Sequence, residues 1–344
     1  METTLSRAPA GGVSLRRQVA RFQSPTVHES LAQVATSFGG FLATCAAMYA
    51  LTGVSWWLAL LLAPLAAGFV VRVFIIQHDC GHQAFFRSRR WNDVLGFVCS
   101  VITLTPYTPW RRQHAGHHGI WNDLDRRQSG ADIYSSCLTV EEYRALGPRD
   151  RLIYRVTRHP LVANVLLPPL IFLFLYRLPF DMPKSWRHER RVVHLTTLAL
   201  VLTWGGLGLV VGFDRLAAIQ LPVLVLAAII GVGLFSVQHR AEDVRWIRNE
   251  AWTPVRAAVE GSTYLHLPRV LQWFTGNIGF HHIHHLNPRV PNYRLRECHE
   301  AIAAFDEVPR LSLRQALAAS RLTLWDEDAG HMVTFREAAA AGAS

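Results

Sequence analysis

Four long apolar runs dominate this chain of 344 residues and limit the folds that it can adopt. The runs cover residues 37–53, 55–77, 192–213 and 216–238. Each is close to the roughly 20 residues that an α-helix needs to cross a bilayer. Only short breaks, at Thr52-Gly53 and at Asp214-Arg215, separate the members of each pair, so the runs predict two hairpins of membrane-spanning helices. The expected fold class is an all-α integral membrane protein.

Two further apolar segments are too short or too interrupted to span a bilayer. Residues 94–105 are too few for a spanning helix. Residues 161–176 contain Pro168 and Pro169, and proline breaks helical hydrogen bonding. We expect both segments to be interfacial or re-entrant.

Basic residues flank the apolar runs and indicate the orientation of the chain. The sequence holds 35 Lys and Arg against 25 Asp and Glu, which gives a formal net charge of +10. The arginines stand in blocks beside the apolar runs, as in the cytoplasmic loops of membrane proteins, so we expect no nucleic-acid partner. By the positive-inside rule, both termini and the polar segments lie in the cytoplasm.

The polar and apolar segments divide the chain into three expected parts. These are a cytoplasmic N-terminal segment at 1–34, a membrane domain with a cytoplasmic cap at 35–300, and a cytoplasmic C-terminal tail at 301–344. The first 30 residues have no apolar stretch, so we expect no cleavable signal peptide. Lys184 is the only lysine, which is typical of a GC-rich bacterial genome and favours a bacterial inner membrane.

Ten of the 17 histidines fall into four short stretches. The stretches are His78–His82, His114–His118, Gln238-His239 and His281–His285. In a helix, residues three or four positions apart share a face, and imidazole nitrogens suit Fe, Cu, Ni or Zn. We therefore expect nine metal ligands: His78, His82, His114, His117, His118, His239, His281, His284 and His285.

These stretches also fall on one side of the predicted membrane. His78 ends the second apolar run and His239 ends the fourth, while the other stretches lie in cytoplasmic segments. Nine rings exceed what one tetrahedral zinc can bind, and they fit two metal ions with four or five ligands each. A metal transporter would need polar groups near the bilayer midplane, and these runs are almost purely apolar.

Other polar residues are candidates for the surroundings of the metals. His282 lies off the face that its neighbours share, which leaves open whether it binds a metal or orients a ligand. Gln238 and Asn277 are candidates to hold a metal-bound water. Ring-orienting carboxylates are expected among Asp93, Asp123, Asp125, Asp132, Glu242 and Asp243.

The three multi-histidine clusters resemble the HxxxH, HxxHH and HxxHH boxes of the membrane-bound fatty acid desaturases. The flanking sequence is similar to the Δ12/ω-6 acyl-lipid branch in FIIQHDCGH at 74–82, TPYTPWRRQHAGHH at 105–118, LDRR at 124–127, LTVEEY at 138–143 and TGNIGFHHIHHLNPRVPNYRL at 275–295. The similarity runs from about residue 35 to 300. A departure follows the second box, where WNDLDRRQSGADIY replaces a shorter, Gly-rich segment. Asp79, Cys80 and Gly81 agree with the first box and are expected to be spacers.

The resemblance implies a centre of two iron ions that uses O2 and electrons to introduce a cis double bond into the acyl chain of a membrane lipid. It also implies that a histidine after the last span, here His239, joins the boxes. No cytochrome b5 module is visible in the sequence, so a separate ferredoxin or cytochrome b5 type protein is expected to donate the electrons. A lipid or carotenoid hydroxylase or ketolase uses the same metal chemistry and stays an alternative.

The chemistry supports a redox metal. A methylene within an acyl chain has no acidic hydrogen for a side-chain base to remove. Zinc has no redox chemistry, whereas iron with open coordination positions can bind and reduce O2. The acyl chain must reach the metals away from water, so we expect a narrow apolar tunnel among the spans. Arg72, about two turns before His78, is expected either to extend to the interface or to bind an acidic residue or a lipid headgroup.

Overall fold

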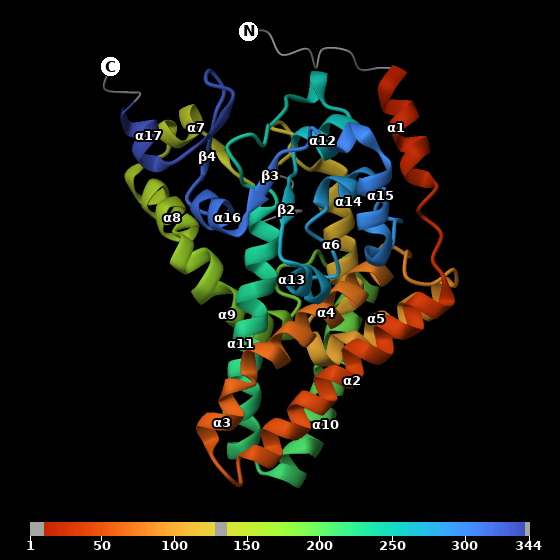
Figure 1. Ribbon diagram of the computed structural model, residues 1–344. Helices are drawn as coiled ribbons and strands as arrows, with labels where there is room; N and C mark the ends of the chain where they lie inside the picture. The colour runs from red at the N-terminus through yellow and green to blue at the C-terminus, as the bar shows by residue number, and fades with distance from the viewer. Residues whose placement is uncertain (1–9, 128–135, 341–344) are drawn as a thin grey trace.

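The computed structural model describes residues 10–127 and 136–340, and most of these are helical. In Figure 1 the long helices α2 (Val27–Leu51), α10 (Arg187–Val211) and α11 (Phe213–Val237) extend to one end of the molecule, and α4 (Ala63–Gly81) lies in its middle. Shorter helices and strands form the other end, together with α1 (Ala10–Ala20). We call the described parts of residues 107–158 and 239–340 the cap.

In the part of the chain that the structure describes, four stretches are long and apolar enough to cross a membrane, namely Val27–Leu51, Trp56–Gly81, Arg187–Val211 and Phe213–Val237. This confirms the number and order of the predicted spans. The first helix begins at Val27 rather than near residue 37, because a more polar stretch continues it. The second stretch is divided between α3 (Trp56–Leu61) and α4, where Pro64 in the first turn of α4 has no N–H for the helical ladder.

Helix α4 is the central span. It packs against α2, against α11 and against α5 (Arg89–Thr103). Ala66 and Val70 of α4 share one buried apolar cluster with Met48 of α2 and Ile219 of α11. The small side chain of Ala66 lets the neighbouring helices approach closely. The end of α4 is therefore held from several sides, which matters for the histidines that it carries.

The two interrupted segments form helices that are short or bent. Residues 94–105 fall largely within α5, which is not among the helices long enough to span. Residues 161–176 fall in a bent pair, in which α8 (Pro148–Arg158) and the stretch Val162–Arg177 meet at 57°. That stretch consists of a π-helical turn at Val162–Leu166, α9 (Leu167–Leu173) and a 3-10 turn at Leu175–Arg177. The depth of both segments in the membrane stays a prediction.

The cap consists of short helices and short strands. The helices are α6 (Tyr107–Ile120), α7 (Val140–Ala145), α8, α12 (Pro254–Glu260), α13 (Arg269–Phe274), α14 (His281–Leu286), α15 (Leu295–Ala301), α16 (Leu313–Ala319) and α17 (Phe335–Ala340). Three 3-10 turns lie at Asn249–Ala251, Asn292–Arg294 and Ala303–Phe305. The part of the molecule that carries most of the clustered histidines is thus mostly helical.

Five short strands within the described residues correct the prediction of an all-α fold, although the chain is mostly helical. β4 (Leu324–Asp326) pairs in parallel with β1 (Leu138–Thr139) and antiparallel with β5 (His331–Val333), and β2 (Tyr264–His266) pairs in parallel with β3 (Arg310–Ser312). Each strand has two or three residues, too few to show an alternating pattern in the sequence. The two parallel pairings attach the C-terminal part of the chain to the rest of the cap.

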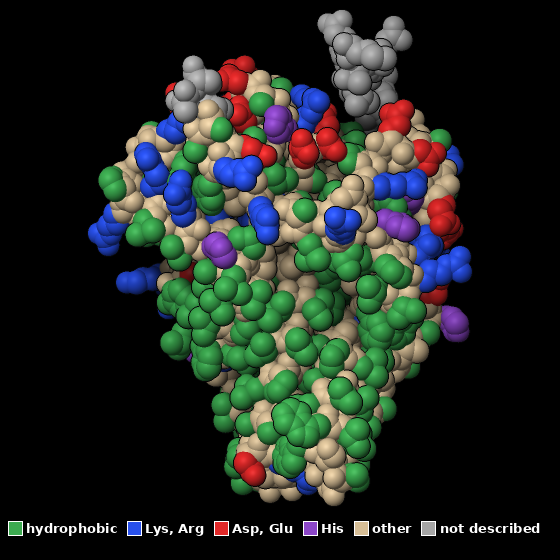
Figure 2. Space-filling model, turned by 60° about the vertical axis from the view of Figure 1, so that its left-hand side comes forward, with side chains coloured by type: hydrophobic (Ala, Val, Ile, Leu, Met, Phe, Trp, Pro, Cys, Tyr) green, Lys and Arg blue, Asp and Glu red, His purple; other side chains and the backbone are tan. Residues whose placement is uncertain are grey.

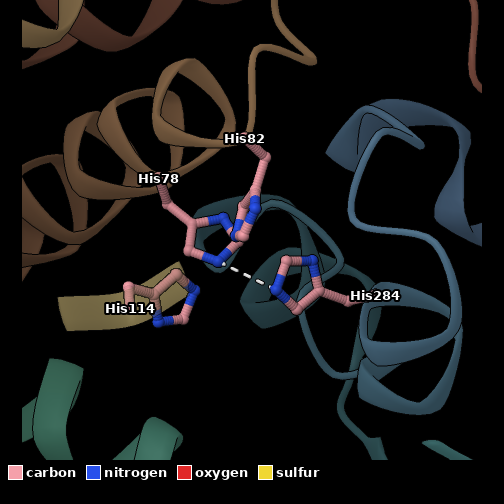
Figure 3. Close-up of side chains that lie close together, drawn as sticks. All are labelled: His78, His82, His114 and His284. Atoms are coloured by element: carbon pink, nitrogen blue, oxygen red, sulfur yellow. Dashed lines mark hydrogen bonds between the residues drawn. The ribbon is translucent and has the colours of Figure 1, made fainter. Parts of the chain in front are cut away.

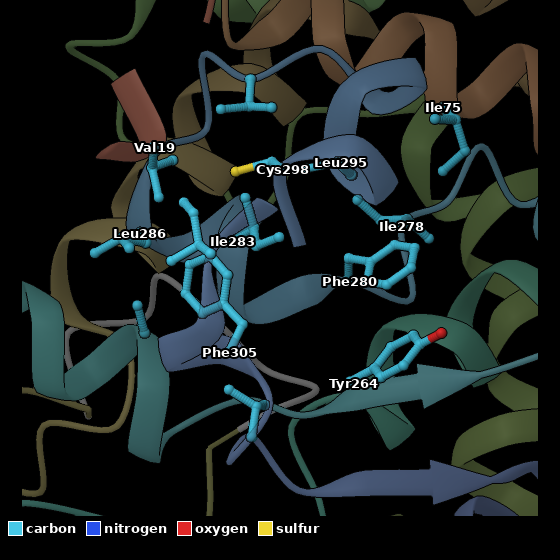
Figure 4. Close-up of a cluster of buried hydrophobic side chains, with 14 residues drawn as sticks. Val19, Ile75, Tyr264, Ile278, Phe280, Ile283, Leu286, Leu295, Cys298 and Phe305 are labelled. Atoms are coloured by element: carbon cyan, nitrogen blue, oxygen red, sulfur yellow. The ribbon is translucent and has the colours of Figure 1, made fainter. Parts of the chain in front are cut away.

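A buried apolar cluster holds α14 in place (Figure 4). Ile283 of α14 is fully buried and lies in this cluster with Phe280, Cys298 and Phe305. A helix of six residues is not stable alone in water, so this packing and the contact with α12 fix its position. The other side of α14 is then free to present histidines to the interior.

The surface of the molecule has an apolar part over the long helices and a charged part over the cap. Figure 2 shows hydrophobic side chains covering the long helices and Lys and Arg side chains gathered above them. Leu209 and Val210 of α10 are 81% and 82% exposed, which is costly in water and favourable in hydrocarbon. This division is typical of a protein that is embedded in a bilayer.

The close approach of α2 and α4 yields a prediction. A Cβ at Gly40 would lie 2.2 Å from the Phe69 ring, and Trp273 and Phe274 pack edge-on against that ring. Because the ring has little room to move, Gly40→Ala is expected to destabilise the packing by about 1–3 kcal/mol. The measurement is the midpoint of thermal unfolding of the purified protein in detergent, which should fall.

The neighbouring glycine provides the matched control. A Cβ at Gly39 would meet no atom within 4 Å, and alanine is the better helix former. Gly39→Ala should therefore leave the midpoint unchanged or raise it slightly. If Gly39→Ala and Gly40→Ala lowered the midpoint equally, the close approach at Gly40 would be refuted.

Candidate metal centre

Four elements bring the nine predicted ligands together inside the molecule. His78 lies in the last turn of α4, and His82 directly follows that helix. His239 follows the end of α11 by two residues. The remaining six are His114, His117 and His118 on α6 and His281, His284 and His285 on α14. Spacing by three or four residues on α6 and α14 turns these rings to one side, as the helical period predicts.

A first group comprises His78, His82, His114 and His284, whose ligand atoms all lie within 4.8 Å of one another. Figure 3 shows these rings converging from the end of α4, from α6 and from α14. The Nε2 atoms of His78 and His284 are 3.1 Å apart. His118 joins this group, because its Nε2 lies 2.9 Å from Nε2 of His284 and 3.2 Å from Nε2 of His114.

A second group comprises His117, His239 and His285, whose ligand atoms also lie within 4.8 Å of one another. Nε2 of His285 is 3.3 Å from Nε2 of His117 and 3.3 Å from Nε2 of His239. His281 joins this group, with its Nε2 at 3.1 Å from that of His285 and 3.0 Å from that of His239. The nine rings thus form a set of five and a set of four.

Hydrogen bonds between rings do not account for this packing. A neutral imidazole has one donor nitrogen and one acceptor nitrogen. Nε2 of His285 nevertheless faces three other Nε2 atoms at 3.1–3.3 Å, and Nε2 of His284 faces two. The buried Nε2 of His82 has no hydrogen-bond partner among the described residues. A cation that accepts several lone pairs would satisfy these nitrogens, so the residues fit a metal site.

Burial favours the neutral form of several of these rings. Desolvation lowers the pKa of His82, His114 and His118 well below its ordinary value, and the neighbouring imidazoles lower it further. The same causes lower the pKa of His284 and His285. A neutral ring offers the lone pair that a metal requires, whereas a protonated ring offers none. The interior therefore favours binding of a metal cation over binding of protons.

A carboxylate orients one of the rings and was not predicted from the sequence. Oδ1 of Asp79 lies 3.2 Å from Nδ1 of His78. Oδ2 of Asp79 accepts hydrogen bonds from the backbone N–H and the side-chain amide of Asn292, at 2.7 and 2.9 Å. A carboxylate on the far nitrogen of a ligand histidine fixes its tautomer and its direction. Its position directly after the first histidine of the box was the available signal, and it was interpreted as a spacer.

Two tryptophans also contact rings of both groups. The rings of Trp110 and His114 stack with centroids 4.7 Å apart and an interplanar angle of 16°. The centroid of the Trp121 ring lies 3.8 Å from that of His239. Trp121 is held in turn by a hydrogen bond of 2.6 Å from its Nε1 to the carbonyl of Gly261. These contacts restrict rotation of the imidazoles, and no spacing in the sequence predicted them.

Most of the predicted ring-orienting carboxylates lie in contacts with other groups. Oδ1 of Asp93 accepts from Arg111 and Tyr107. Buried Asp123 accepts from Arg126, and Asp125 accepts from Arg248. Glu242 and Asp243 are exposed, and Asp132 lies outside the described residues. The structure therefore shows an arginine partner, rather than an imidazole, for Asp93, Asp123 and Asp125.

The three remaining candidates lie in different surroundings. Nε2 of His282 is 3.2 Å from Nδ1 of His299, and its ring packs edge-on against Phe305, so it faces neither group. Asn277 has a positive φ of 55° and donates from its side chain to the carbonyl of Asn292. Gln238 is buried, and its Nε2 has no hydrogen-bond partner among the described residues.

An apolar cavity of about 480 Å³ reaches the two groups of histidines. Its walls include Val70 and Phe74 of α4, Ile171 of α9, and Ala228 and Gly231 of α11. Near the metal groups it is lined by His78, His114, His117, His281 and Gln238. The volume lies within the ~300–1,000 Å³ that is usual for small-molecule sites. Its walls suit a hydrocarbon chain.

Arg72 has neither of its expected roles. Its side chain is buried, its guanidinium lies 3.7 Å from the centre of the Trp273 ring, and it donates to the carbonyl of Trp273. This cation–π contact and hydrogen bond tie α4 to α13, which directly precedes the segment that leads to α14. Arg72 therefore connects α4, which carries the first histidine cluster, to the segment that precedes the third cluster on α14.

Comparison with known proteins agrees with this geometry. The family model for fatty acid desaturases matches residues 55–316, a range that contains all nine histidines. The chain is 42% identical over 322 residues to a fatty acid desaturase of Bacillus subtilis (strain 168), which covers 94% of this chain and 90% of that protein. It is 24% identical over 262 residues to an sn-1 oleoyl-lipid 12-desaturase of Picosynechococcus sp., covering 74% and 72%.

A third relative is an sn-1 acyl-lipid omega-3 desaturase (ferredoxin) of Nostoc sp., 26% identical over 242 residues, which cover 67% of this chain and 63% of that protein. The family match includes the last three of the four apolar stretches as well as the histidine clusters, so it extends beyond a shared local motif. The chain therefore belongs to the fatty acid desaturase family, and it is an integral membrane oxidoreductase that desaturates fatty acyl chains.

Proposed function

We propose that this desaturase uses O2 and two iron ions to introduce a cis double bond into the acyl chain of a membrane lipid. The observation that carries the proposal is the meeting of two groups of histidine nitrogens with one apolar cavity. The two groups supply the ligands, and the cavity supplies a dry path for a hydrocarbon chain. Neither feature alone would distinguish a redox enzyme from a metal-binding or a lipid-binding protein.

The two sets of rings would hold one iron ion each. The first set is His78, His82, His114, His118 and His284, and the second is His117, His239, His281 and His285. Iron in such sites supplies the redox chemistry with O2 that an unactivated methylene requires. Asp79 holds a proton on Nδ1 of His78, which leaves Nε2 free for the metal. Gln238 is placed to hold a water at the end of the cavity, whereas Asn277 and His282 act at a distance.

The cavity walls position the acyl chain. The side chains of α4, α9 and α11 exclude water, so the acyl chain replaces no strongly bound solvent when it enters. The apolar walls also hold one methylene pair beside His114 and His117 rather than letting the chain slide freely. The shape of this cavity would then determine the position of the double bond.

We propose a topology of two hairpins with the cap on the cytoplasmic side of a bacterial inner membrane. α2 contacts α4 and α10 contacts α11, and only Gly212 separates the last two helices. The basic surface above the apolar helices supports this orientation. The proposal also places two segments in the cytoplasm, at 1–34 and 301–344. It places two more at the membrane interface or as re-entrant segments, near 94–105 and 161–176.

The electrons would come from a separate protein. Two relatives, from Nostoc sp. and from Synechocystis sp., carry ferredoxin in their names, which favours a ferredoxin over a cytochrome b5 type donor. The position of the double bond is proposed as Δ12/ω-6, on the strength of the motifs around the histidines. Relatives named as 12-desaturases, from Picosynechococcus sp. and Synechocystis sp., support this position.

Expression in a host that lacks polyunsaturated lipids tests the function. With a ferredoxin and its reductase supplied, the membranes should gain diunsaturated acyl chains with the new cis bond at Δ12, located by mass spectrometry of derivatised lipids. The new bond should require air during growth. Hydroxylated or keto lipids in place of new double bonds would assign the chain to the alternative chemistry, and a bond at another position would refute only the Δ12/ω-6 part.

The ligand assignment predicts a difference between two histidines on one short helix. His284→Ala removes a ring whose Nε2 faces two others, so iron binding should weaken more than tenfold. His282→Ala is the matched control, because its ring is equally buried but faces His299. The measurement is the iron content of each purified variant. Equal loss of iron in both variants would refute the assignment of His284.

The acyl cavity predicts the effect of filling it. A Cβ at Gly231 would meet no atom within 4 Å, and this residue lines the cavity. Gly231→Leu should therefore lower desaturation of long acyl chains by about 10²-fold, because a misplaced chain reacts slowly. Its iron content should stay unchanged. Gly206→Leu, at an exposed and equally open position on α10, should retain full activity; equal activity of the two variants would contradict the proposed path of the chain.

A further inference from the structure

A second cavity lies on another face of α11 and is lined by none of the nine clustered histidines. Its volume is about 1410 Å³, and among the described residues Leu234 alone lines both cavities. It is an open groove between α11, α8 with the π-helical turn that follows, α16 and α17. We call it the lateral groove, lined chiefly by Arg158, Leu161, Ile230, Gly233, Leu317 and Arg321.

The floor of the lateral groove is apolar and uncovered. Leu161, Leu313 and Leu317 are 52%, 47% and 65% exposed. Gly233 of α11 also lines the groove, and a Cβ there would meet no atom within 4 Å. Part of the floor belongs to a membrane span, so the groove is continuous with the surface that faces hydrocarbon. An apolar surface of this kind requires a covering ligand or lipid.

The rim of the groove is basic. Four arginines line it: Arg155, Arg158, Arg321 and Arg336. Within residues 10–127 and 136–340 none of the four forms an ion pair. One carboxylate, that of Glu337, also lines the rim, and it is engaged in capping α17 by accepting from the backbone and the hydroxyl of Thr334 at 2.8 Å.

Two of these arginines are already oriented by the protein. Arg155 donates from Nε to the hydroxyl of Tyr143, and Arg158 donates to the carbonyl of Ser136 at 3.2 Å. Nε of Arg158 is buried and has no hydrogen-bond partner among the described residues. Arg321 and Arg336 are exposed. The guanidinium groups therefore have donors available for an anion, and their planar fork matches a phosphate.

We propose that the lateral groove binds an anionic phospholipid at a site separate from the acyl cavity. The phosphate and the headgroup lie among Arg158, Arg321 and Arg336, and an acyl chain covers Ile230, Gly233 and Leu317. The face in Figure 2 shows basic side chains directly above the apolar surface, which is the level of lipid headgroups. An acidic protein would match the rim, but it would leave the apolar floor uncovered.

The bound lipid joins parts of the chain that are distant in sequence. α16 and α17 belong to the cap, whereas α11 is a span, and they approach each other across the groove. A ligand that binds the folded state alone stabilises it in proportion to the logarithm of its concentration. An anionic lipid should thus stabilise the cap on the membrane part, and a zwitterionic lipid should do so less.

The experiment uses the full chain, purified in detergent and stripped of lipid. Phosphatidylglycerol or phosphatidylcholine is added back in steps, the midpoint of thermal unfolding is recorded, and retained lipid is counted by native mass spectrometry. Phosphatidylglycerol should raise the midpoint and stay bound, and phosphatidylcholine should not. The double variant Arg321→Gln/Arg336→Gln should weaken binding of phosphatidylglycerol about tenfold or more, because two charge-assisted contacts are lost. Gly233→Leu, which fills the floor, should weaken it as well.

The matched control removes the same charge outside the groove. Arg149 on α8 and Arg314 on α16 are exposed and do not line it, so Arg149→Gln/Arg314→Gln should bind phosphatidylglycerol like the unaltered chain. Equal effects of the two lipids, or of the two double variants, would overturn the proposal. If only binding of an acidic ferredoxin changed in Arg321→Gln/Arg336→Gln, the groove would be a protein-docking site and the proposal would be wrong.

Discussion

The convergence of nine imidazoles around two points in the interior is the constraint on which the structure depends. Each buried ring loses its hydration, and a buried polar nitrogen without a partner costs free energy. Several Nε2 atoms face one another at about hydrogen-bond distance, where one proton cannot serve them all. The arrangement is stable only if a cation satisfies the lone pairs and the fold holds the rings in place before it binds.

The fold provides that rigidity from outside the centre. α14 is too short to be helical alone, and Ile283 anchors it in an apolar cluster. The end of α4 is held by its neighbours and, through Arg72 and Trp273, by the segment that precedes α14. Asp79 then directs His78 from behind. The apolar cluster, the cation–π contact and the carboxylate each restrict the movement of an element that carries ligands. A metal site is preorganised by contacts of this kind.

The features that could be predicted from the sequence are those that depend on the spacing of residues within one short segment. Apolar length predicted the four spans, and intervals of three and four residues predicted which rings share a face on α6 and α14. Contacts between distant segments were not predictable in this way. Asp93, Asp123 and Asp125 were reasonable partners for imidazole, yet each bonds to an arginine, because the sequence shows an acid without showing its neighbour. The short strands were missed because each has only two or three residues, and because the two parallel pairings join segments that lie far apart in the chain.

Helix α11 connects the two cavities with the proposed metal ligands. Near its end, Val237 lines the lateral groove, Gln238 lines the acyl cavity, and His239 belongs to the second set of rings. Three consecutive residues thus have three different surroundings. They cannot move independently, because planar peptide bonds and the helical backbone fix their relative positions. A change that tilts the end of α11 to relieve crowding in the groove would also move His239. Lipid binding and iron content therefore have to be measured on the same variant, since only a loss of lipid with iron retained separates the groove from the metal centre.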